Sequence, residues 1–382
     1  MIKAVDLLLC RCEYKYKDFK SLKMSLSEIH IKDVRNITST QLQPSSKLNV
    51  IVGPNGSGKT SLLEGLYLLS RARSFRTHNI KKVISYEQKN LLVYAELNHR
   101  GVKNKIALKK DATETVIRIN GKTEKKSSEL SRYLLTHLIR PESQALLEGG
   151  AAIRRSFVDW GVFHVKHDFI NTSKRYNQLL KQRNKLLKSK QFETLHSWND
   201  KLAECGIMVA SERERYIIRL EVELRLISKE LLGEADISIE YLKGWDKELT
   251  LSQALDKTRA RDIQYGYTTM GAHKSDIRIL VNNKLAQDFL SRGQMKLLVI
   301  ALYLAQIKVM FERQAKSACV LLDDLAAELD ANNFRKVMSF LVSLDIQVFV
   351  TTTNESLFLE YIESKGSKVF HVKHGCIQKG VV

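Results

Sequence analysis

The hydrophobic positions change their period along the chain, and each change predicts a different kind of element. Residues 48–52 form a short apolar run rich in β-branched side chains, which predicts a buried strand. Apolar side chains then recur at helical spacing over residues 61–69. Residues 26–34 and 91–119 alternate between apolar and polar side chains, and Asn120-Gly121 forms a tight-turn signal. We therefore expect an antiparallel sheet laid over the first buried strand.

The middle of the chain becomes helical in its pattern. Residues 174–190 and 204–232 carry apolar side chains at helical spacing, which predicts two helices packed as an antiparallel arm. At 1.5 Å per residue, the segment 163–234 allows helices of at most about 40 Å. Farther on, residues 297–307 predict an apolar helix, and residues 319–322 predict a second buried strand.

A glycine-rich loop joins the first buried strand to the first helix. It fits the pattern G-x-x-x-x-G-K-[ST] at every fixed position, in the strand–loop–helix context that this pattern requires. Backbone N–H groups of such a loop converge on phosphate oxygens, and the helix start adds its positive dipole end. We expect a nucleoside triphosphate to bind there, with Lys59 at the β- and γ-phosphates and the Thr60 hydroxyl on Mg²⁺. The predicted binding residues are Gly53, Pro54, Asn55, Gly56, Ser57, Gly58, Lys59 and Thr60.

Two neighbouring carboxylates follow the second buried strand. Asp323 is expected to hold Mg²⁺ together with Thr60, and Asp324 to act as the base that polarises the attacking water, with Lys59 as the other catalytic residue. Arg35 and Asn36 occupy a turn from which a side chain could reach the nucleotide. An ordinary exposed turn explains this pair equally well.

A Ser-x-Gly-Gln sequence stands at the start of the apolar helix. Its members are Ser291, Arg292, Gly293 and Gln294. At a helix start these residues offer a hydroxyl and free N–H groups to an anion. Between a phosphate loop and an Asp-ending strand, the sequence is typical of the ATP-binding-cassette (ABC) class, in which the loop of one subunit faces the Ser-x-Gly-Gln sequence of another. An ATP-dependent homodimer is therefore implied by the class.

The charge balance points to a polyanionic partner. The 382 residues include 62 Lys and Arg against 42 Asp and Glu, a formal net charge of +20. A surface this basic attracts nucleic acid, and we expect contact with DNA. The predicted DNA-binding residues are Arg71, Arg73 and Arg76 around Phe75, and Lys174, Arg175, Lys181, Arg183 and Lys185 of the arm. For the arm residues, the alternative is a charged face that contacts only solvent. For the arginines around Phe75, the alternative is a solvent-exposed loop with one buried Phe.

Other bulk features exclude several classes of protein. No apolar stretch approaches the length of a membrane span, so we expect no membrane partner. The five cysteines are scattered and odd in number, so we expect free thiols in a reducing cytosol. Residues 1–23 lack the pattern of a signal peptide and are expected to be a disordered or dispensable extension.

Several longer motifs resemble the RecF family of bacterial DNA replication and repair proteins. Pro141-Glu142, Leu146–Gly149 and Arg154–Asp159 resemble the first signature sequence of that family. Gly271–Asp276 resembles its second signature sequence. The similarity runs from Met24 almost to the end of the chain. Ala151 and Ala272 stand where the family usually has Pro. The switch His of the cassette transporters is replaced by Thr351-Thr352-Thr353.

The resemblance implies a cytoplasmic protein that binds ATP, Mg²⁺ and DNA at single-strand gaps beside duplex. Together with RecR-type and RecO-type mediator proteins, it would help to load a recombinase. Its weak, DNA-stimulated ATPase would act as a switch on dimerisation. The expected fold is α/β, an ABC-type P-loop ATPase head with an antiparallel β subdomain and a helical arm domain. The expected boundaries are 1–23 for the extension, 24–140 and 266–382 for the two parts of the head, and 141–265 for the arm.

Three other classes of protein share the phosphate loop. An SMC-like chromosome or break-repair ATPase has the same head, but its arm is a long coiled coil with a Cys-x-x-Cys hook, which this chain lacks. The ATPase subunit of a membrane transporter predicts a mildly charged surface and a switch His. A metabolic P-loop kinase gives the Ser-x-Gly-Gln sequence no role.

Overall fold

A computed structural model describes residues 24–99, 102–311, 318–344, 346–362 and 366–379. The chain forms two compact units, which are described separately. Unit 1 comprises residues 1–138, 315–323 and 341–382, and unit 2 comprises residues 139–314 and 324–340. The predicted extension 1–23 lies outside the described residues. Contacts thus place the Ser-x-Gly-Gln sequence in unit 2 and the phosphate loop in unit 1, whereas the predicted boundaries assign both to the head.

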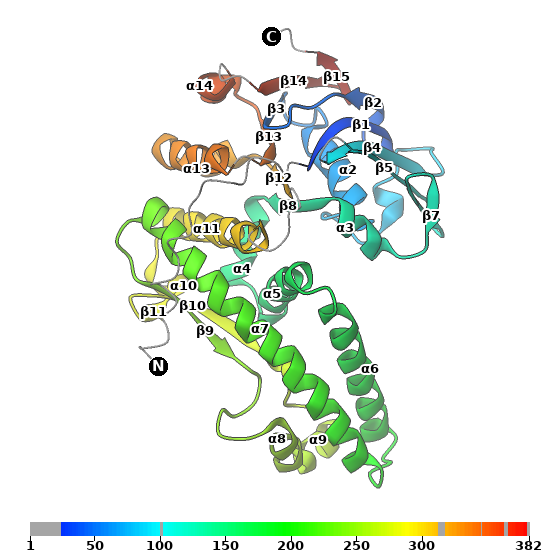
Figure 1. Cartoon of the computed structure of the whole chain (residues 1–382), viewed down its shortest axis with the longest axis vertical. Helices are drawn as coiled ribbons and strands as arrows, with labels where there is room; N and C mark the ends of the chain where they lie inside the picture. Colours follow the sequence, from blue (N-terminus) through cyan, green and yellow to red (C-terminus); the bar gives the residue numbers. More distant parts are fainter. Residues whose placement is uncertain (1–23, 100–101, 312–317, 345, 363–365, 380–382) are drawn as a thin grey trace. The chain divides into compact units, whose positions relative to one another are not determined.

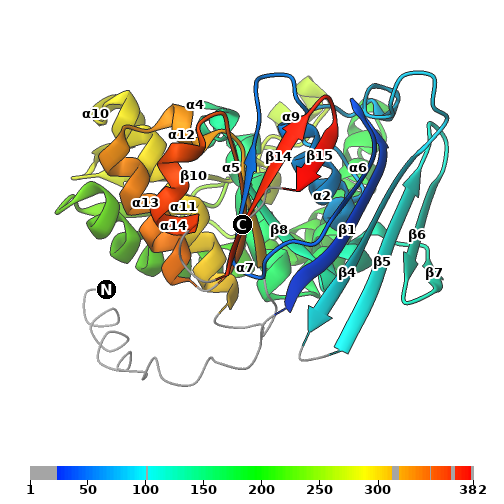
Figure 2. The ribbon, with the colours of Figure 1, turned by 90° about the horizontal axis from the view of Figure 1, so that it is seen from above.

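Unit 1 contains two six-stranded sheets (Figures 1 and 2). The first has the order β2-β1-β4-β5-β6-β7 and is antiparallel throughout. Asn120 and Gly121 both have positive φ (50° and 82°) between the last two strands, as the tight-turn signal predicted. Its strands are β1 (Met24–Val34), β2 (Ile37–Leu42), β4 (Leu91–His99), β5 (Val102–Lys110), β6 (Thr115–Ile119) and β7 (Lys122–Glu124).

The second sheet has the order β15-β14-β3-β13-β12-β8. The pairs β12–β13, β13–β3 and β3–β14 are parallel, and β15 is antiparallel to β14. The sheet therefore places the carboxyl ends of β3 and β12 at the same edge. Its strands are β3 (Leu48–Val52), β8 (Leu135–Ile139), β12 (Ala318–Leu322), β13 (Gln347–Thr352), β14 (Ser367–Lys373) and β15 (Cys376–Lys379).

Helix α2 (Lys59–Arg71) lies between the two sheets and forms the centre of the core of unit 1 (Figure 2). Leu62, Leu63 and Leu66 are fully buried. Gly65 lets β1 approach the helix, since a Cβ at that position would lie 2.6 Å from Cδ1 of Ile31. Apolar side chains on both faces of α2 therefore join the two sheets into one unit. The remaining helices of unit 1 are the short α3 (Leu130–Tyr133) and α14 (Leu359–Ile362), with the end of α13 (Ala331–Ser343).

Unit 2 is built around two long helices, α7 (Leu195–Leu232) and α11 (Arg292–Phe311), which pack against each other. Helix α6 (Phe169–Lys188) runs beside α7 and forms the predicted antiparallel arm (Figure 1). A small antiparallel sheet of order β11-β10-β9 completes the unit. Its other elements are α4 (Ala145–Glu148), α5 (Ala151–Val165), β9 (Ile237–Leu242), α8 (Leu251–Lys257), α9 (Arg259–Tyr265), β10 (Asp276–Val281), β11 (Lys284–Leu285), α10 (Ala286–Phe289), α12 (Leu325–Glu328) and most of α13.

Two expectations about the helices are wrong. Helix α7 has 38 residues, which corresponds to about 57 Å instead of at most 40 Å. It begins nine residues earlier than predicted because Leu195, Asn199 and Leu202 are buried and continue the same apolar face. Over Arg292–Met310, α11 is long and apolar enough to cross a membrane, which contradicts the expectation that no apolar stretch approaches that length. This part of the helix is 67% buried, as in the core helix of a globular unit.

The described cysteines agree with the predicted free thiols. Cys205 and Cys319 are buried and Cys376 is exposed, and none of these three forms a disulfide.

Candidate nucleotide-binding site

The glycine loop of unit 1 connects β3 to α2 in the predicted order. Gly56 and Gly58 have φ values of 77° and 116°, which only glycine adopts readily. Gly58 immediately precedes the first residue of α2, Lys59. The loop thus turns its backbone sharply at two points and brings the start of the helix beside the carboxyl end of the strand.

The side chain of Lys59 folds back onto the glycine loop. Its Nζ donates hydrogen bonds to the carbonyl oxygens of Gly53 (2.7 Å) and Pro54 (3.1 Å). The side chain is largely buried, which holds the ammonium group inside the curve of the loop. A cation in this position can reach the terminal phosphates of a nucleotide that the loop's N–H groups bind.

The structure brings Thr60 and Asp323 together from 263 residues apart in the sequence. Thr60 Oγ1 donates to Asp323 Oδ1 over 3.0 Å, and Thr351 Oγ1 donates to the same oxygen over 2.9 Å. Asp323 directly follows β12, and Thr351 belongs to the neighbouring strand β13. The contact of Thr351 with Asp323 is not among the predicted ones. The regular position of Thr351 at the carboxyl end of a buried strand was the available signal.

A second missed contributor is the turn between β14 and β15. The backbone N–H of Gly375 donates to Ser57 O over 2.8 Å, so this turn contacts the glycine loop. Gly375 has a φ of 74°, and a Cβ there would lie 2.0 Å from Asn36 O. Asn36 itself donates to Gly56 O over 3.1 Å and accepts from the Ser61 hydroxyl over 2.8 Å. Asn36 therefore links the glycine loop to α2, and Gly375 allows the close packing.

Arg35 is held by a buried carboxylate. Its Nε and Nη2 donate to the two oxygens of Glu64 over 2.8 and 2.9 Å, and its Nη1 donates to Lys82 O over 2.6 Å. Ser74 also donates to Glu64, and Arg76 lies 4.0 Å from it. Glu64 thus joins the turn at Arg35 to the segment Ser74-Phe75-Arg76. A role of Arg35 in nucleotide binding stays a prediction.

The arginines after α2 occupy different surroundings. Arg71 lies over the ring of Tyr67, 5.2 Å from its centroid. Arg71 and Arg73 line a cavity of about 550 Å³ together with Lys110. Burial and the neighbouring Arg73 lower the pKa of Lys110. Asp111 and Glu114 line the same cavity, so its charge is mixed with an excess of cations. The contact of these arginines with DNA stays a prediction.

The Ser-x-Gly-Gln sequence caps α11 in unit 2. Gln294 N donates to the Ser291 hydroxyl over 3.3 Å, and Ser291 N donates to Gln294 Oε1 over 3.0 Å. This reciprocal pair is a capping box with Gln in the third position. All four residues, 291–294, are exposed. The sequence therefore presents an organised helix start on the surface of unit 2.

Asp324 has a φ of 53° and precedes α12. The segment that follows it is tied to α11, since Lys296 Nζ lies 2.5 Å from Glu328 Oε2 and donates to Glu328 O over 3.2 Å. The positive φ of Asp324 is a backbone conformation that Asp and Asn adopt more readily than most residues.

The two RecF-like signatures meet inside unit 2. Arg154 of the first signature forms a bidentate pair with Asp276 of the second, with distances of 2.7 and 2.9 Å. Arg155 donates to Ser275 O over 2.8 Å. Asp159 pairs in the same way with Arg213 of α7. These charged positions thus bind α5, α7 and β10 to one another and act as structural contacts.

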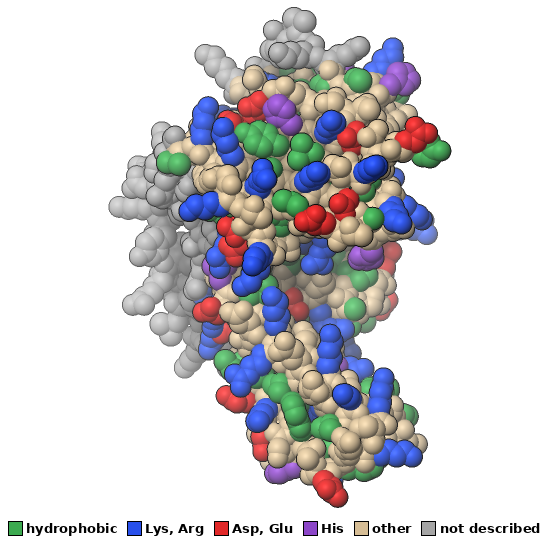
Figure 3. Space-filling model, turned by 90° about the vertical axis from the view of Figure 1, so that its right-hand side faces the viewer, with side chains coloured by type: hydrophobic (Ala, Val, Ile, Leu, Met, Phe, Trp, Pro, Cys, Tyr) green, Lys and Arg blue, Asp and Glu red, His purple; other side chains and the backbone are tan. Residues whose placement is uncertain are grey.

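The arm cations divide into exposed and buried side chains. Lys174, Arg175, Lys181 and Lys185 are exposed on α6, and Figure 3 shows Lys and Arg side chains spread over the face that it displays. Arg183 is fully buried and forms an ion pair of 2.8 Å with Asp262. The prediction that Arg183 binds DNA is wrong, because a guanidinium committed to a buried carboxylate cannot reach a phosphate.

The parallel sheet, the glycine loop with Lys59 and the Asp-ending strand β12 together define a P-loop ATPase head of the ABC type. The model of the RecF/RecN/SMC N terminal domain matches residues 25–378. The DNA replication and repair protein RecF of Shewanella sediminis is 40% identical over 354 residues, 92% of this chain and 98% of that protein. RecF of Shewanella woodyi is 38% identical over 93% of this chain and 98% of its own length. The chain belongs to the RecF family.

Solved structures support the same assignment. The recombination mediator protein RecF with ATP, described as part of the RecFOR pathway, is 27% identical and has a TM-score of 0.85. The match covers 96% of this chain and all of that one. An SMC head bound to the C-winged helix domain of ScpA is 14% identical, with a TM-score of 0.56 over 94% of this chain and 98% of that chain. This second similarity shows the ABC-type head fold alone.

Proposed function

We propose that this protein is an ATP-dependent DNA-binding protein of gap repair, with a slow ATPase that switches its dimerisation. The observation that carries the proposal is the meeting of Lys59, Thr60 and Asp323 at the carboxyl edge of the parallel sheet. The protein would recognise single-strand gaps beside duplex DNA and help to load a recombinase. The RecF relatives and the RecF–ATP structure support this assignment.

Mg²⁺ fits the two oxygens at this edge. Thr60 Oγ1 and Asp323 Oδ1 are hard oxygen ligands 3.0 Å apart, and Mg²⁺ usually takes only one or two protein ligands beside phosphate oxygens and water. Within the described part of the chain, no group of three or more His, Cys, Asp or Glu side chains could hold a metal alone. Bound with ATP, Mg²⁺ would neutralise charge that develops on the phosphates. Thr351 would hold the Asp323 carboxylate in its orientation.

Hydrolysis would use Asp324 as general base and a second subunit to complete the site. The exposed, capped start of α11 offers its Ser291 hydroxyl and the backbone N–H groups of Arg292 and Gly293 to a γ-phosphate bound by the glycine loop of a partner copy. An ATP-dependent homodimer then contains two such composite sites. Bound DNA would raise the rate of ATP hydrolysis by this dimer.

DNA binding would be led by phosphate contacts. The net charge of +20 and the exposed cations Lys174, Arg175, Lys181 and Lys185 support it, together with Arg71, Arg73 and Arg76. RecR-type and RecO-type mediator proteins are the proposed protein partners, in the cytoplasm.

The decisive experiment measures binding of gapped DNA with and without ATP. Lys59→Ala should weaken ATP binding roughly tenfold or more, because it removes a charged hydrogen-bond donor to phosphate, and should abolish the ATP dependence of DNA binding. Lys122→Ala, which removes an exposed cation on β7, is the matched control. Unchanged ATP affinity of the Lys59 variant by titration calorimetry would reject the nucleotide site. No binding of gapped DNA by the wild type would reject the proposed function.

The shared site has its own test. Lys59→Ala and Ser291→Arg should each be nearly inactive as an ATPase, because every composite site then contains one defective half. A mixed dimer places both defects in one site and leaves the other intact, so mixing should restore part of the activity. ATP-induced dimers should be measured directly in the same samples. Normal dimerisation and hydrolysis by the Ser291 variant alone would exclude the composite site.

A further inference from the structure

Two tyrosines stack on each other at the surface of unit 2. Tyr265 is the last residue of α9, and Tyr267 follows two positions later. Their ring centroids are 5.8 Å apart and the rings are inclined by 17°. Tyr265 is 55% exposed and Tyr267 is 44% exposed. A stacked aromatic pair that leaves about half of its surface in solvent does not serve the core.

The backbone between the rings is built for this arrangement. Gly266 has a φ of 71° and ends α9 in the left-handed conformation, where its N–H donates to Asp262 O over 2.8 Å. A residue with a side chain would be strained at this φ. The glycine turn thus brings the side chains at positions 265 and 267 together.

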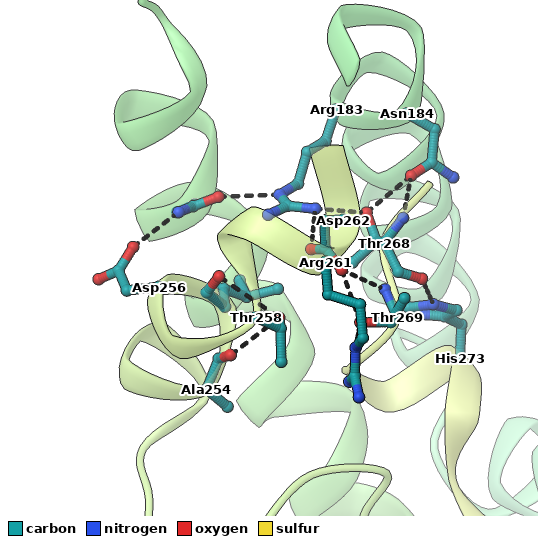
Figure 4. A network of polar contacts seen from close by, with 12 residues as sticks. Arg183, Asn184, Ala254, Asp256, Thr258, Arg261, Asp262, Thr268, Thr269 and His273 are labelled. Atoms are coloured by element: carbon teal, nitrogen blue, oxygen red, sulfur yellow. Dashed lines mark hydrogen bonds and ion pairs between the residues drawn. The ribbon is translucent and has the colours of Figure 1, made fainter. Parts of the chain in front are cut away.

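A buried polar network anchors both ends of this turn (Figure 4). On one side, Asp262 pairs with the buried Arg183 of α6. On the other side, Thr269 donates to Asp262 through its backbone N–H (2.9 Å) and its hydroxyl (2.6 Å). Thr268 accepts from Arg183 over 2.8 Å, and its carbonyl contacts His273 Nε2 at 3.0 Å. The tyrosine pair is therefore held in place before any ligand arrives, which lowers the entropic cost of binding.

The exposed charges on the segment that carries the tyrosines have one sign. From residue 259 to 275 the exposed charged residues are Arg259, Arg261 and Lys274, and the single acidic residue, Asp262, is buried. Lys274 Nζ lies over the ring of Tyr267, 5.4 Å from its centroid. From α6, the exposed Lys188 also reaches this turn, since its Cγ lies 3.7 Å from the position of a Cβ at Gly266.

We propose that Tyr265 and Tyr267 form a stacking platform for unpaired bases of single-stranded DNA, whose phosphates are neutralised by Arg259, Arg261 and Lys274. Aromatic rings beside a basic surface are how proteins bind single strands without reading their sequence, because every base has a π-face. This inference rests on the proposed DNA-binding function and assigns the single-stranded part of the substrate to a definite site. Because the exposed charges of residues 259–275 are all positive, this segment favours a polyanion over an ordinary protein partner.

The test uses the full-length protein with ATP and compares an oligothymidine strand with a blunt duplex by fluorescence anisotropy. Replacing both tyrosines, Tyr265→Leu with Tyr267→Leu, should weaken single-strand binding roughly tenfold or more, because bases lose their stacking partners. Affinity for the blunt duplex should not change. The matched control, Tyr265→Phe with Tyr267→Phe, keeps both rings and should stay within about twofold of wild type.

Salt dependence separates stacking from charge. The leucine variant should keep the wild-type slope of log affinity against log salt, because no cation is removed. Lys274→Gln should reduce that slope by about 0.7 on single strands. A lower slope in the leucine variant would show that it perturbs the basic surface, and would overturn the stacking assignment.

Photocrosslinking of the wild type to iodouridine-substituted single strands provides evidence that does not depend on how the variants fold. Crosslinks mapped by mass spectrometry to Tyr265 or Tyr267 support the platform, and crosslinks confined to other residues overturn it. Wild-type single-strand affinity in a folded leucine variant also overturns it and leaves the proposed function standing. If that variant instead loses an acidic peptide or protein partner, the tyrosines form a protein-docking site and the DNA assignment is wrong.

Discussion

Removing the buried guanidinium of Arg183 tests whether this residue stabilises unit 2 or contacts DNA. Arg183 was predicted to contact DNA, but its side chain is fully buried. Its Nε donates to Asn199 Oδ1, and its Nη1 donates to Asp262 Oδ2 and to Thr268 Oγ1, each over 2.8 Å. Arg183→Ala should therefore destabilise unit 2 and leave the electrostatics of DNA binding almost unchanged.

The size of the effect follows from what the variant leaves behind. Without Arg183, the Asp262 carboxylate remains fully buried, with Thr269 as its hydrogen-bond donor. Breaking a buried ion pair from one side costs about 3–5 kcal/mol. The lower end applies here, because Thr269 still satisfies one oxygen and because Arg183 Nη2 is buried without a hydrogen-bond partner among the described residues. We expect a loss of about 3 kcal/mol in the free energy of unfolding of unit 2.

Tryptophan fluorescence is a selective assay for this unit. The chain contains three tryptophans, Trp160, Trp198 and Trp245, and all of them belong to unit 2. A loss of 3 kcal/mol should lower the urea midpoint of the fluorescence transition by roughly 1 M if the slope is near 3 kcal/mol per molar. The matched control is Lys181→Ala, an exposed cation of the same helix, which should change stability by less than about 0.5 kcal/mol.

The same two variants separate structural from DNA-binding cations. Lys181→Ala should reduce the salt slope of duplex binding by about 0.9 if this lysine neutralises one phosphate, and Arg183→Ala should not. Equal stability of the two variants would show that the buried pair of Arg183 and Asp262 does not stabilise unit 2. A reduced salt slope for a folded Arg183 variant would restore Arg183 to the DNA-binding surface.

Three further predictions concern other parts of the chain. Burial lowers the pKa of His273 to about 4 from about 6.5 in the unfolded chain, so between these values the unfolded state binds more protons and the stability of unit 2 should fall as the pH falls. His273→Gln should remove that part of the pH dependence, whereas the exposed His196→Gln should not; identical profiles would contradict the assignment. Ala151→Pro at the first position of α5 should raise the free energy of unfolding by about 0.4–1 kcal/mol, since Gly150 already has an extended conformation, and a loss of stability in the urea titration would be the contrary result. Asp324→Asn should lower ATP turnover by roughly a hundredfold or more and leave ATP affinity intact, because Asn tolerates the positive φ but cannot accept a proton, and a normal turnover rate excludes Asp324 as the base.

Local patterns were sufficient for the elements around the nucleotide site. The apolar run of β3, the glycine loop and the helical spacing of α2 are contiguous in sequence, so their order and conformations follow from short-range sterics. The same holds for the turn at Asn120-Gly121 and for the capped start of α11, where Ser291 and Gln294 lie three residues apart. The confirmed antiparallel sheet follows from strict alternation over consecutive strands.

Long-range packing decided what the patterns could not. The period of a helix shows which side chains share a face, but it does not show which face another element covers, and for this reason Arg183 was grouped with exposed cations. The early start of α7 depends on burial of Leu195 and Leu202, which only tertiary contacts supply.

The sequence by itself determined the family, the phosphate loop and the two acids that follow β12, because each of these is encoded in a short run of residues. Only the tertiary structure decided that Thr351 contacts Asp323 and Gly375 contacts the phosphate loop, that Arg154 and Asp276 join the two signatures, and that Tyr265 and Tyr267 stack in solvent. Such contacts depend on how strands order themselves in a sheet and on which side chains lose their water. Both are properties of the whole packed chain, because the free energy of burying a group depends on every neighbour that surrounds it.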